Sequence, residues 1–354
     1  MDTDSIRRFL FLVFQQLSGA VTSAMIHLGD RLGLYRTLRE ATGPLSSEEL
    51  AQRAGLHERW VREWLFSQAS AGLLEYVPPN RFQLSPEAVL VLADENSPVF
   101  SAGAFHALPQ QMAVVEKLPE SFRSGLGLPY DAFGCEGAIG VERFLAPWFR
   151  TFLVPLVLPA LEGVVAKLEG GAKVADLGCG AGVALIEMAR AFPRSEFHGY
   201  EISQYALERA RQNIEAAGVR NVTLHQARAE EIPHDASFDF ITSFDCIHDM
   251  THPQEVMHAV RAALKPDGTW FIVDINAQPT FEENRQRNPL AAMMYGISVL
   301  SCLSSSLSEP GGAGLGTLGF CEPVARRMAD AAGFRTFRRH EFDNPVHAYY
   351  ELRP

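Results

Sequence analysis

The stretch that decides the fold is Val174-Ala175-Asp176-Leu177-Gly178-Cys179-Gly180-Ala181-Gly182. It begins with a short, mostly apolar run that is typical of a buried strand. Three glycines at alternate positions follow, and residues 183–191 then show a helical pattern. A strand, a glycine loop and a helix in this order place a nucleotide-like ligand above the carboxyl end of a parallel sheet. Glycine suits this loop because the turn needs unusual backbone angles and because a Cβ atom would hold the ligand away.

The spacing of the glycines narrows the kind of ligand. A dinucleotide site requires G-x-G-x-x-G, whereas this loop is G-x-G-x-G and is followed by Val183. The pattern therefore disfavours a pyrophosphate at the helix N-terminus and a nicotinamide-dependent oxidoreductase. Glu201 ends the next predicted strand, where a carboxylate can accept hydrogen bonds from both ribose hydroxyls. Asp176 has apolar neighbours and is costly to bury alone, so we expect it to accept from loop N–H groups or to face a cationic ligand.

The second half of the chain alternates strands and helices from residue 172 onward, which predicts a parallel sheet with helices on both faces. Strands are predicted at 174–177, 196–200, 222–225, 238–244, 269–275, 335–340 and 348–352. The loop 340–345 is too short for a right-handed crossover, so the last strand must run antiparallel. The predicted fold class is α/β: a Rossmann-like, seven-stranded, mostly parallel sheet with an antiparallel last strand, behind a mostly helical N-terminal winged-helix domain.

The N-terminal half is predicted to be helical. Residues 4–41 contain the apolar run 9–14, which indicates packing against a second chain or deep in its own chain, and we expect the contact with a second chain. Residues 45–83 show a helix-turn-helix pattern followed by a small hairpin. The charges of the second helix nearly cancel, which disfavours DNA binding. The predicted domains are a helical, winged-helix dimerisation domain (1–95), a helical connector that caps the pocket (96–168) and a ligand-binding domain (169–354) with a lid insertion (276–320).

Residues 170–354 resemble the class I S-adenosylmethionine-dependent methyltransferases. Asp176–Gly182 looks like the first motif of that family, and Tyr200-Glu201-Ile202-Ser203 looks like the second. The N-terminal part resembles the winged-helix dimerisation domain of bacterial small-molecule methyltransferases, a subgroup sometimes labelled transcriptional regulators. The resemblance implies S-adenosyl-L-methionine as the cofactor, with the glycine loop near its methionine moiety and Glu201 at its ribose. The implied cofactor-binding residues are Asp176, Gly178, Cys179, Gly180, Gly182, Glu201, Ile202, Arg228, Ala229, Phe244 and Asp245.

One position departs from the family pattern. After the third strand the family usually places an acid that bonds the adenine amino group, and this chain has Arg228 there. Three alternatives remain open for the adenine contact: the backbone of Ala229, stacking of Arg228 on the ring, and the carboxylate of Glu230.

The catalytic residues predicted from the segment after the fourth strand are His248 and Asp249. His248 is the best general base in the chain because an imidazole titrates near neutral pH. We expect Asp249 or Asp245 to orient its ring. The alternative is that His248 caps a turn and that Asp249 caps the helix that starts near residue 253.

A divalent metal ion is a further alternative. His248, Asp249, His252 and His347 offer nitrogen and carboxylate ligands for an ion that would bind an α-keto or catechol-like substrate. Pro253, however, breaks the helical face that His248 and His252 would share. The sequence therefore predicts no metal site.

The predicted function is methyl transfer to a small-molecule acceptor, at a hydroxyl oxygen, with His248 as general base. Two alternatives are metal-assisted C-methylation of an α-keto acid-like substrate and a cofactor-sensing, DNA-binding regulator. The lid residues Met293, Met294 and Tyr295 indicate a partly apolar substrate. The sequence does not identify the acceptor.

The composition of the chain indicates its cellular compartment and the kinds of partner that it disfavours. The net charge of −11 disfavours a nucleic-acid or anionic-membrane partner for the whole chain. Five scattered cysteines without CxxC spacing fit a reduced cytoplasm. The apolar run 9–14 is interrupted by Gln15-Gln16, so we expect neither a signal peptide nor a membrane span. The chain is predicted to be a cytoplasmic homodimer.

Overall fold

The computed structural model describes residues 2–354. They form two compact units. One unit contains the chain up to Pro109 together with Gly140–Trp148, and the other contains Gln110–Ile139 and Phe149–Pro354. Each unit is described by itself.

The first unit is helical and carries one small hairpin. Its elements are α1 (Thr3–Arg31), α2 (Leu34–Arg39), α3 (Ser47–Ala54), α4 (Glu58–Ser70), β1 (Glu75–Val77), β2 (Arg81–Gln83), α5 (Pro86–Ala88), η1 (Val89–Ala93), η2 (Ala102–Phe105), the start of α6 (Leu108–Ala113) and the end of α8 (Gly134–Trp148). The predicted helix-turn-helix and wing are present as α3, α4 and the antiparallel pair β1–β2.

Local sequence signals explain the winged helix. Ser46 and Glu49 form a reciprocal capping box at the start of α3, and Gly55 ends that helix in the left-handed conformation. The apolar faces of α2, α3 and α4 pack around Leu50, Leu65 and Tyr35, which are almost completely buried. This core is separate from that of the sheet.

Helix α1 differs from the sequence expectation. It continues without a break through Gln15-Gln16 for 29 residues, and an apolar stretch within it has a mean hydropathy of 1.6. By length and composition alone it could cross a membrane, so the expectation that this region is too short was wrong. The glutamines do not end the helix because Gln is a good helix former. Residues 130–160 with 164–170 pass the same test only as a pair bent by 107°.

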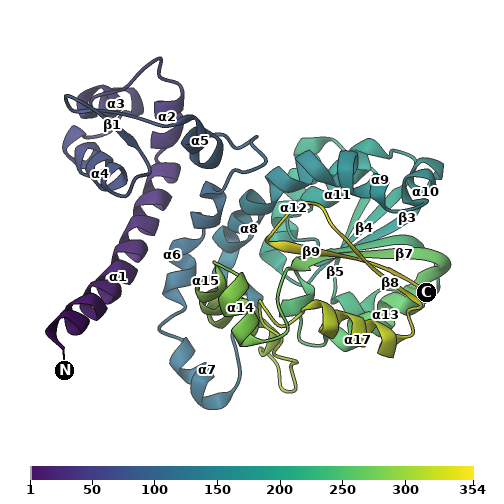
Figure 1. The fold of residues 1–354 in the computed structure, drawn as a ribbon. Coiled ribbons are helices and arrows are strands. Elements are labelled where there is room, and N and C mark those ends of the chain that lie inside the picture. The colour runs from purple at the N-terminus through teal and green to yellow at the C-terminus, as the bar shows by residue number, and fades with distance from the viewer. Residues whose placement is uncertain (1) are drawn as a thin grey trace. The chain divides into compact units, whose positions relative to one another are not determined.

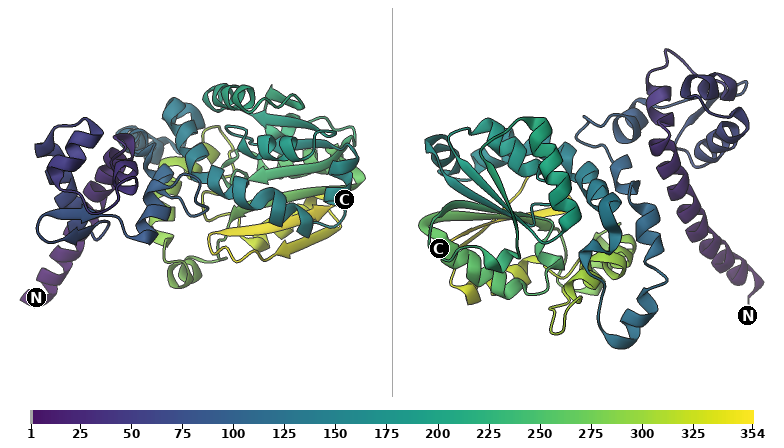
Figure 2. Two further views of the ribbon diagram at one scale, coloured as in Figure 1. Left: turned by 90° about the horizontal axis from the view of Figure 1, so that it is seen from above. Right: turned by 180° about the vertical axis from the view of Figure 1, so that it is seen from behind.

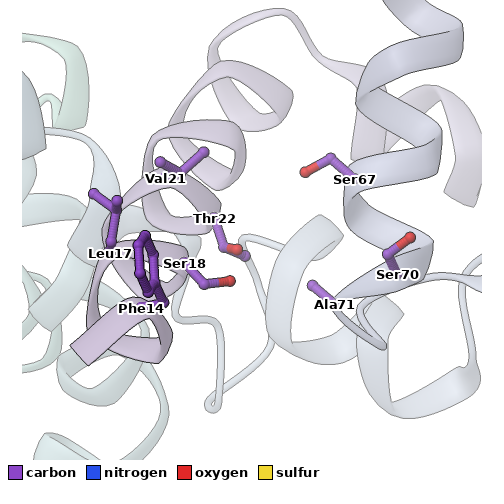
Figure 3. A pocket seen from close by; sticks show the side chains of 8 residues that line it. All are labelled: Phe14, Leu17, Ser18, Val21, Thr22, Ser67, Ser70 and Ala71. Atoms are coloured by element: carbon purple, nitrogen blue, oxygen red, sulfur yellow. The ribbon is translucent and has the colours of Figure 1, made fainter. Parts of the chain in front are cut away.

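A hollow of about 450 Å³ lies between α1 and the end of α4 (Figure 3). Phe14, Leu17 and Val21 line it from α1, and Ser67 and Ser70 line it from α4. Many apolar side chains of α1 are exposed. They are Ile6, Phe9, Leu10, Phe11, Leu12, Val13, Phe14, Leu17 and Val21.

The second unit contains the sheet. Its strands are β3 (Lys173–Leu177), β4 (Glu196–Glu201), β5 (Val222–Gln226), β6 (Phe238–Phe244), β7 (Leu264–Ile275), β8 (Thr336–His340) and β9 (His347–Arg353). Its helices are the end of α6, α7 (Leu118–Ser124), η3 (Tyr130–Phe133), the start of α8, η4 (Phe149–Val157), α9 (Leu158–Ala160), α10 (Val164–Gly170), α11 (Val183–Ala191), α12 (Gln204–Ala217), η5 (Ala229–Glu231), η6 (Ile247–Asp249), α13 (Pro253–Ala263), α14 (Phe281–Arg287), α15 (Ala291–Ile297), η7 (Ser298–Cys302), α16 (Leu303–Ser306) and α17 (Glu322–Ala332).

The strand order is β5-β4-β3-β6-β7-β9-β8 (Figure 1). The strands β5, β4, β3, β6 and β7 pair in parallel, and β9 is antiparallel to both of its neighbours, β7 and β8, so β8 runs in the same direction as the first five. The predicted fold class is therefore confirmed, and the antiparallel strand lies inside the sheet next to β7. Helices α11 and α12 cover one face, whereas α13 and α17 cover the other (Figures 1 and 2).

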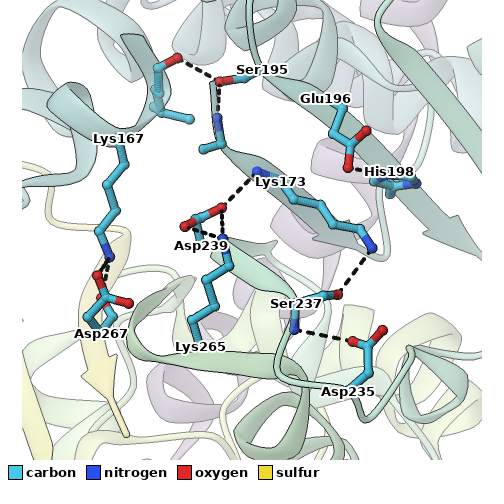
Figure 4. A network of polar contacts seen from close by, with 12 residues as sticks. Lys167, Lys173, Ser195, Glu196, His198, Asp235, Ser237, Asp239, Lys265 and Asp267 are labelled. Carbon is cyan, nitrogen blue, oxygen red and sulfur yellow. Dashed lines mark hydrogen bonds and ion pairs between the residues drawn. The ribbon is translucent and has the colours of Figure 1, made fainter. Parts of the chain in front are cut away.

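The amino end of the sheet is fixed by charged side chains (Figure 4). Asp239 accepts hydrogen bonds from the backbone N–H of Lys173 and from the ammonium of Lys265. Lys167 pairs with Asp267 at 2.7 Å. The opposite, carboxyl end of the strands carries the candidate site.

Candidate active site

The glycine loop after β3 has the backbone that the sequence predicts. Gly178, Gly180 and Gly182 have φ angles of +67°, +54° and +75°. A Cβ atom on Gly178 would lie 2.9 Å from Cys246, so this glycine lets the loop pack on the segment after β6. A Cβ atom on Gly180 would meet nothing within 4 Å. The backbone of Gly180 therefore borders open space, as a ligand-binding loop requires.

Glu201, at the end of β4, fixes the glycine loop. One carboxylate oxygen accepts from the backbone N–H of Gly180 at 3.0 Å, and the other accepts from that of Ser203 at 2.8 Å. Burial raises the pKa of this carboxyl, and the backbone N–H groups oppose that effect. A carboxylate can accept about four hydrogen bonds, so Glu201 keeps capacity for hydroxyl groups of a ligand.

Asp176 is buried in β3 and accepts a hydrogen bond from the hydroxyl of Thr242 at 2.8 Å. Its side-chain partner is thus a residue of the adjacent strand β6 and not a loop N–H group. Burial raises the pKa of Asp176 to about 7, with a further contribution from the charge of Glu201. The carboxyl is therefore suited to a neighbouring positive charge, which would return it to the ionised form.

His248 lies on η6, directly after β6, and is buried. Its Nδ1 is 2.6 Å from a carboxylate oxygen of Asp274 near the end of β7. Burial disfavours the charged imidazolium, but the negative charge of Asp274 and its hydrogen bond raise the pKa of His248 well above its usual value. Asp274 is itself completely buried, and its second oxygen has no hydrogen-bond partner among residues 2–354.

The structure therefore corrects the expected partner of His248. Asp274, and not Asp249 or Asp245, bonds the ring, because β6 and β7 are adjacent and their carboxyl ends meet. Asp274 could have been singled out in the sequence. Like Asp176, it is an acidic residue within an otherwise apolar run, here Ile272-Val273-Asp274-Ile275.

Asp245 and Asp249 lie on either side of His248. Asp245 adopts a φ of +50° and binds Nε2 of His347 at 2.8 Å. Burial raises the pKa of Asp249 to about 7, and the charge of His248 opposes the shift. Asp249 is thus electrostatically coupled to the histidine without being its hydrogen-bond partner.

The remaining predicted cofactor residues lie at the same strand ends. Cys179 is buried in the glycine loop, and Ala229 is buried in η5 after β5. Phe244 packs edge-on against Phe149, with ring centroids 4.9 Å apart. Ile202 is exposed beside Glu201. Their role in cofactor binding stays a prediction.

Arg228 is held by several oxygen atoms. Its guanidinium binds Glu230 at 2.6 Å, Glu309 at 2.7 Å and the hydroxyl of Thr251 at 2.5 Å. Glu309 belongs to the insertion 276–320, so Arg228 ties the loop after β5 to that insertion. Because the guanidinium makes these contacts, it is not free to stack on an adenine ring. The adenine contact itself stays a prediction.

The insertion has its own small core. Met294 is buried there with Leu318 and Cys321, whereas Met293 is exposed. Tyr295 packs on Phe281 with ring centroids 5.9 Å apart. The expectation that Met294 marks an apolar substrate surface is therefore not supported, because this side chain stabilises the insertion itself.

Two of the candidate metal ligands pair with other side chains. His347 binds Asp245, and His252 lies 3.7 Å from Glu309. Within residues 2–354, no three His, Cys, Asp or Glu side chains gather in a way that could hold a metal ion.

The fold and the glycine-loop site define a class. A seven-stranded sheet with one antiparallel strand, a glycine loop after its central strand and an acid at the end of the next strand are the features of class I S-adenosylmethionine-dependent methyltransferases. Family models agree with this assignment. Residues 168–308 match a model described as a methyltransferase domain, and residues 20–93 match an Rv2258c-like winged HTH domain.

The chain therefore combines a class I S-adenosylmethionine-dependent methyltransferase domain with an N-terminal winged-helix domain, as the sequence motifs predicted. The cofactor of this class is S-adenosyl-L-methionine, which confirms the predicted cofactor.

Curated O-methyltransferases have sequences that are similar to this chain. The chain is 26% identical to the mitomycin biosynthesis 6-O-methyltransferase of Streptomyces lavendulae, over 73% of this chain and 75% of that protein. It is 32% identical to the ubiquinone biosynthesis O-methyltransferase of an Azoarcus species, over 34% of this chain and 51% of that protein. The chain thus spans about half the length of several ubiquinone-pathway relatives that it matches.

The structural match covers almost the entire chain. A protein from Nostoc punctiforme, named only as a candidate O-methyltransferase, superimposes with a TM-score of 0.74 at 18% identity. The match covers 96% of this chain and 98% of the other. At this identity the comparison supports the fold, including the sheet that positions the site.

Proposed function

We propose that this protein is an S-adenosylmethionine-dependent O-methyltransferase that methylates a hydroxyl group of a small molecule, with His248 as the general base. The observation that carries the proposal is the buried His248–Asp274 pair at the carboxyl ends of β6 and β7. The glycine loop follows β3, which is the neighbour of β6, so both groups lie at the same edge of the sheet.

The residues present fit the cofactor. Gly180 borders open space, and Glu201 is a buried acid with remaining capacity to accept hydrogen bonds. We infer that Glu201 holds ribose hydroxyls and that the glycine loop holds the amino-acid end. The buried acids Asp176 and Asp249 favour a ligand that carries positive charge. When bound, S-adenosylmethionine supplies a methyl group that is already activated by the sulfonium.

The protein then has two tasks. It must align the acceptor oxygen with the methyl group, and it must remove the proton of the hydroxyl. Asp274 fixes the tautomer of His248, since its carboxylate holds a proton on Nδ1 and leaves Nε2 to accept one. As Nε2 gains the proton from the substrate, the same carboxylate stabilises the imidazolium.

A substitution of His248 tests this assignment. We expect His248→Ala to lower turnover by roughly 100-fold or more, because general-base catalysis contributes about that factor. Binding of S-adenosylhomocysteine, measured by calorimetry, should stay within a few-fold of the wild type. A natural acceptor is found first by incubation with labelled S-adenosylmethionine and cell extract. Unchanged turnover of that acceptor by the variant would exclude His248 as the base.

We further propose that the protein is a cytoplasmic homodimer that assembles through its N-terminal unit. The apolar side chains of α1 are exposed, and the hollow beside α4 offers a complementary surface for a second copy. Phe9→Glu should convert a dimer to a monomer in light scattering, whereas the matched change Gln16→Glu on the same helix should not. A wild-type monomer that binds lipid vesicles through α1 would contradict this proposal.

Nucleic acid is not an expected partner. Arg62 pairs with Glu58 at 2.7 Å, and Arg59 pairs with Glu63 at 2.6 Å, both within α4. These carboxylates offset the positive charge that a DNA-reading helix needs. A gel-shift experiment with random DNA at low salt should therefore show no complex.

A further inference from the structure

Arg228 stands where the family pattern has an acid, and its contacts give that departure a physical reason. Each guanidinium nitrogen binds a group from a different segment. Nε donates to Glu230 of η5 at 2.6 Å, and Nη1 donates to Glu309 of the insertion 276–320 at 2.7 Å. Nη2 donates to the hydroxyl of Thr251, which lies in the segment after η6. A carboxylate at position 228 would repel both glutamates, whereas the planar guanidinium binds all three groups at once.

The segment 250–252 continues the chain after η6, the short helix that carries the candidate base. The insertion also contacts the main chain of this segment. The hydroxyl of Ser306 donates to the carbonyl of Met250 at 3.0 Å. The N–H of Ala313 donates to the carbonyl of Thr251 at 2.9 Å. The chain that leaves η6 is therefore bonded to the insertion through both its backbone and its side chains.

Glu309 joins these contacts into one network. One carboxylate oxygen accepts from Arg228, and the other lies 3.7 Å from Nε2 of His252. The hydrogen bond from Arg228 lowers the pKa of this carboxyl, so it is ionised at neutral pH. An isolated, partly exposed ion pair contributes little to stability. Here the pair belongs to a network that also holds Thr251, and the members of such a network do not act independently.

The loop before η3 binds the same part of the insertion. The N–H of Gly127 donates to the carbonyl of Leu307 at 2.8 Å, and the N–H of Leu128 donates to the hydroxyl of Ser304 at 2.7 Å. A Cβ atom on Gly127 would lie 1.9 Å from the carbonyl oxygen of Ser304, so the two backbones are in direct contact. The N–H groups of Gly127 and Ala313 therefore both report whether the insertion is in place.

We propose that Arg228 is a positioning residue for methyl transfer, because its guanidinium holds the insertion on the segment 250–252 and so fixes the helix that carries His248. Loss of these contacts leaves the His248–Asp274 pair in place, since that pair joins the ends of β6 and β7. It releases the chain that sets where Nε2 of the base lies relative to the acceptor. The effect on catalysis rests on the proposed function, whereas the hold on the insertion does not.

The hold on the insertion is tested without an activity assay, by hydrogen exchange of the full chain followed by mass spectrometry. In Arg228→Met the amides of Gly127 and Ala313 should exchange about fivefold faster or more, because their acceptors move away more often. Arg211→Met is the matched control, since it removes an exposed arginine of α12 that pairs with Glu208 at 3.2 Å. It should leave both rates unchanged. Equal rates in wild type and Arg228→Met would overturn the proposal.

Kinetics at saturating S-adenosylmethionine separate positioning from support of the fold. Arg228→Met should lower kcat by about tenfold or more, because a displaced base is misaligned with the acceptor hydroxyl. The inflection of its pH profile should stay in place, since the His248–Asp274 pair is kept. Faster exchange together with unchanged kcat and KM would overturn the positioning role.

Thr251→Val is a second, milder variant that removes one hydroxyl from the network. Its kcat should fall in the same direction, and its Tm should stay within a few degrees of the wild type. Thr223→Val, at an exposed position of β5, is its control and should leave kcat unchanged. A Thr251→Val variant with the kcat of the wild type would contradict a link from Arg228 to the base through this hydroxyl.

The outcomes distinguish this proposal from the proposed function. If Arg228→Met unfolds, amides throughout the sheet will exchange, and Thr251→Val then replaces it in the exchange comparison with the same expected direction. Absence of methyl transfer in the wild type would refute the proposed function alone. The exchange rates of Gly127 and Ala313 would still decide whether Arg228 holds the insertion.

Discussion

Nδ1 of His248 and a carboxylate oxygen of Asp274 lie 2.6 Å apart, on two adjacent strands whose ends meet at the glycine-loop edge of the sheet. The carboxylate does two things at once. It orients the ring, and it raises the pKa of the imidazole against the effect of burial. The resting histidine is therefore protonated at a higher pH than a free one and must lose that proton before it can act as a base.

The first prediction concerns pH. Activity at saturating cofactor should rise with pH through a single inflection above 6.5, the ordinary pKa of histidine. Asp274→Asn removes the negative charge that favours the imidazolium, so the inflection should move to lower pH. The plateau rate should also fall by roughly 10- to 100-fold, because the ring is no longer oriented. An inflection that stays in place in the variant would show that Asp274 does not act on His248.

The second prediction concerns Glu201. Glu201→Gln replaces one acceptor oxygen by an NH₂ group, which cannot accept from the N–H of Gly180 or of Ser203. Affinity for S-adenosylhomocysteine should fall by about 10- to 100-fold, the effect of losing hydrogen bonds to a charged group. Glu196→Gln changes an exposed residue of the same strand and is the matched control. Calorimetric Kd values that are equal in both variants would contradict a ribose role.

The third prediction separates two glycines of one loop. Gly178→Ala creates a contact with Cys246 in addition to strain at positive φ, so it should lower Tm and cofactor affinity together. Gly180→Ala meets no atom, and its destabilisation should stay near 1–2 kcal/mol, the strain of a left-handed alanine. Its loss of cofactor affinity should nevertheless be at least as large as that of Gly178→Ala. Normal binding by Gly180→Ala would mean that the ligand does not approach this part of the loop.

The fourth prediction concerns the contact between Arg228 and Glu309. Glu309→Gln weakens the ion pair that ties the insertion to the loop after β5. Limited proteolysis should then cut the glycine-rich segment 310–316 faster than in the wild type, by several-fold. Glu282→Gln, on α14 of the same insertion, is a suitable control. Equal cleavage rates would show that the pair is not needed to hold the insertion.

The fifth prediction concerns stability in acid. His198 and His225 are neighbours on β4 and β5, with Nδ1 and Nε2 3.1 Å apart. Burial lowers the pKa of both, and the positive charge of Lys173 acts in the same direction. The unfolded chain therefore binds protons at a higher pH than the folded chain, so stability should decrease as pH falls below about 6.5.

His225→Phe provides the comparison for that prediction. The variant keeps an aromatic ring stacked on Tyr200 and removes one titrating group and its repulsion of His198. Its Tm should fall less than that of the wild type between pH 7.5 and pH 5. Parallel Tm curves would assign the acid sensitivity to other groups.

The sequence by itself determined the sheet, the glycine loop and the acid at Glu201. Strand and helix periods, glycine spacing and the short loop before the last strand are local signals, because each depends on residues close together in the chain. For the same reason the winged helix could be predicted from its capping residues and its hairpin. The ends of the observed strands coincide with the predicted ends or differ from them by one residue, except that β7 begins five residues earlier.

Only the tertiary structure decided which side chains meet. His248 pairs with Asp274 because β6 and β7 are adjacent and their carboxyl ends meet. Asp274 is 26 positions from His248 in the sequence (274 − 248), so no local period relates the two residues. The sequence favoured Asp249 because this residue directly follows His248 in the chain. Which side chains meet at the ends of different strands depends instead on the order of the strands in the sheet.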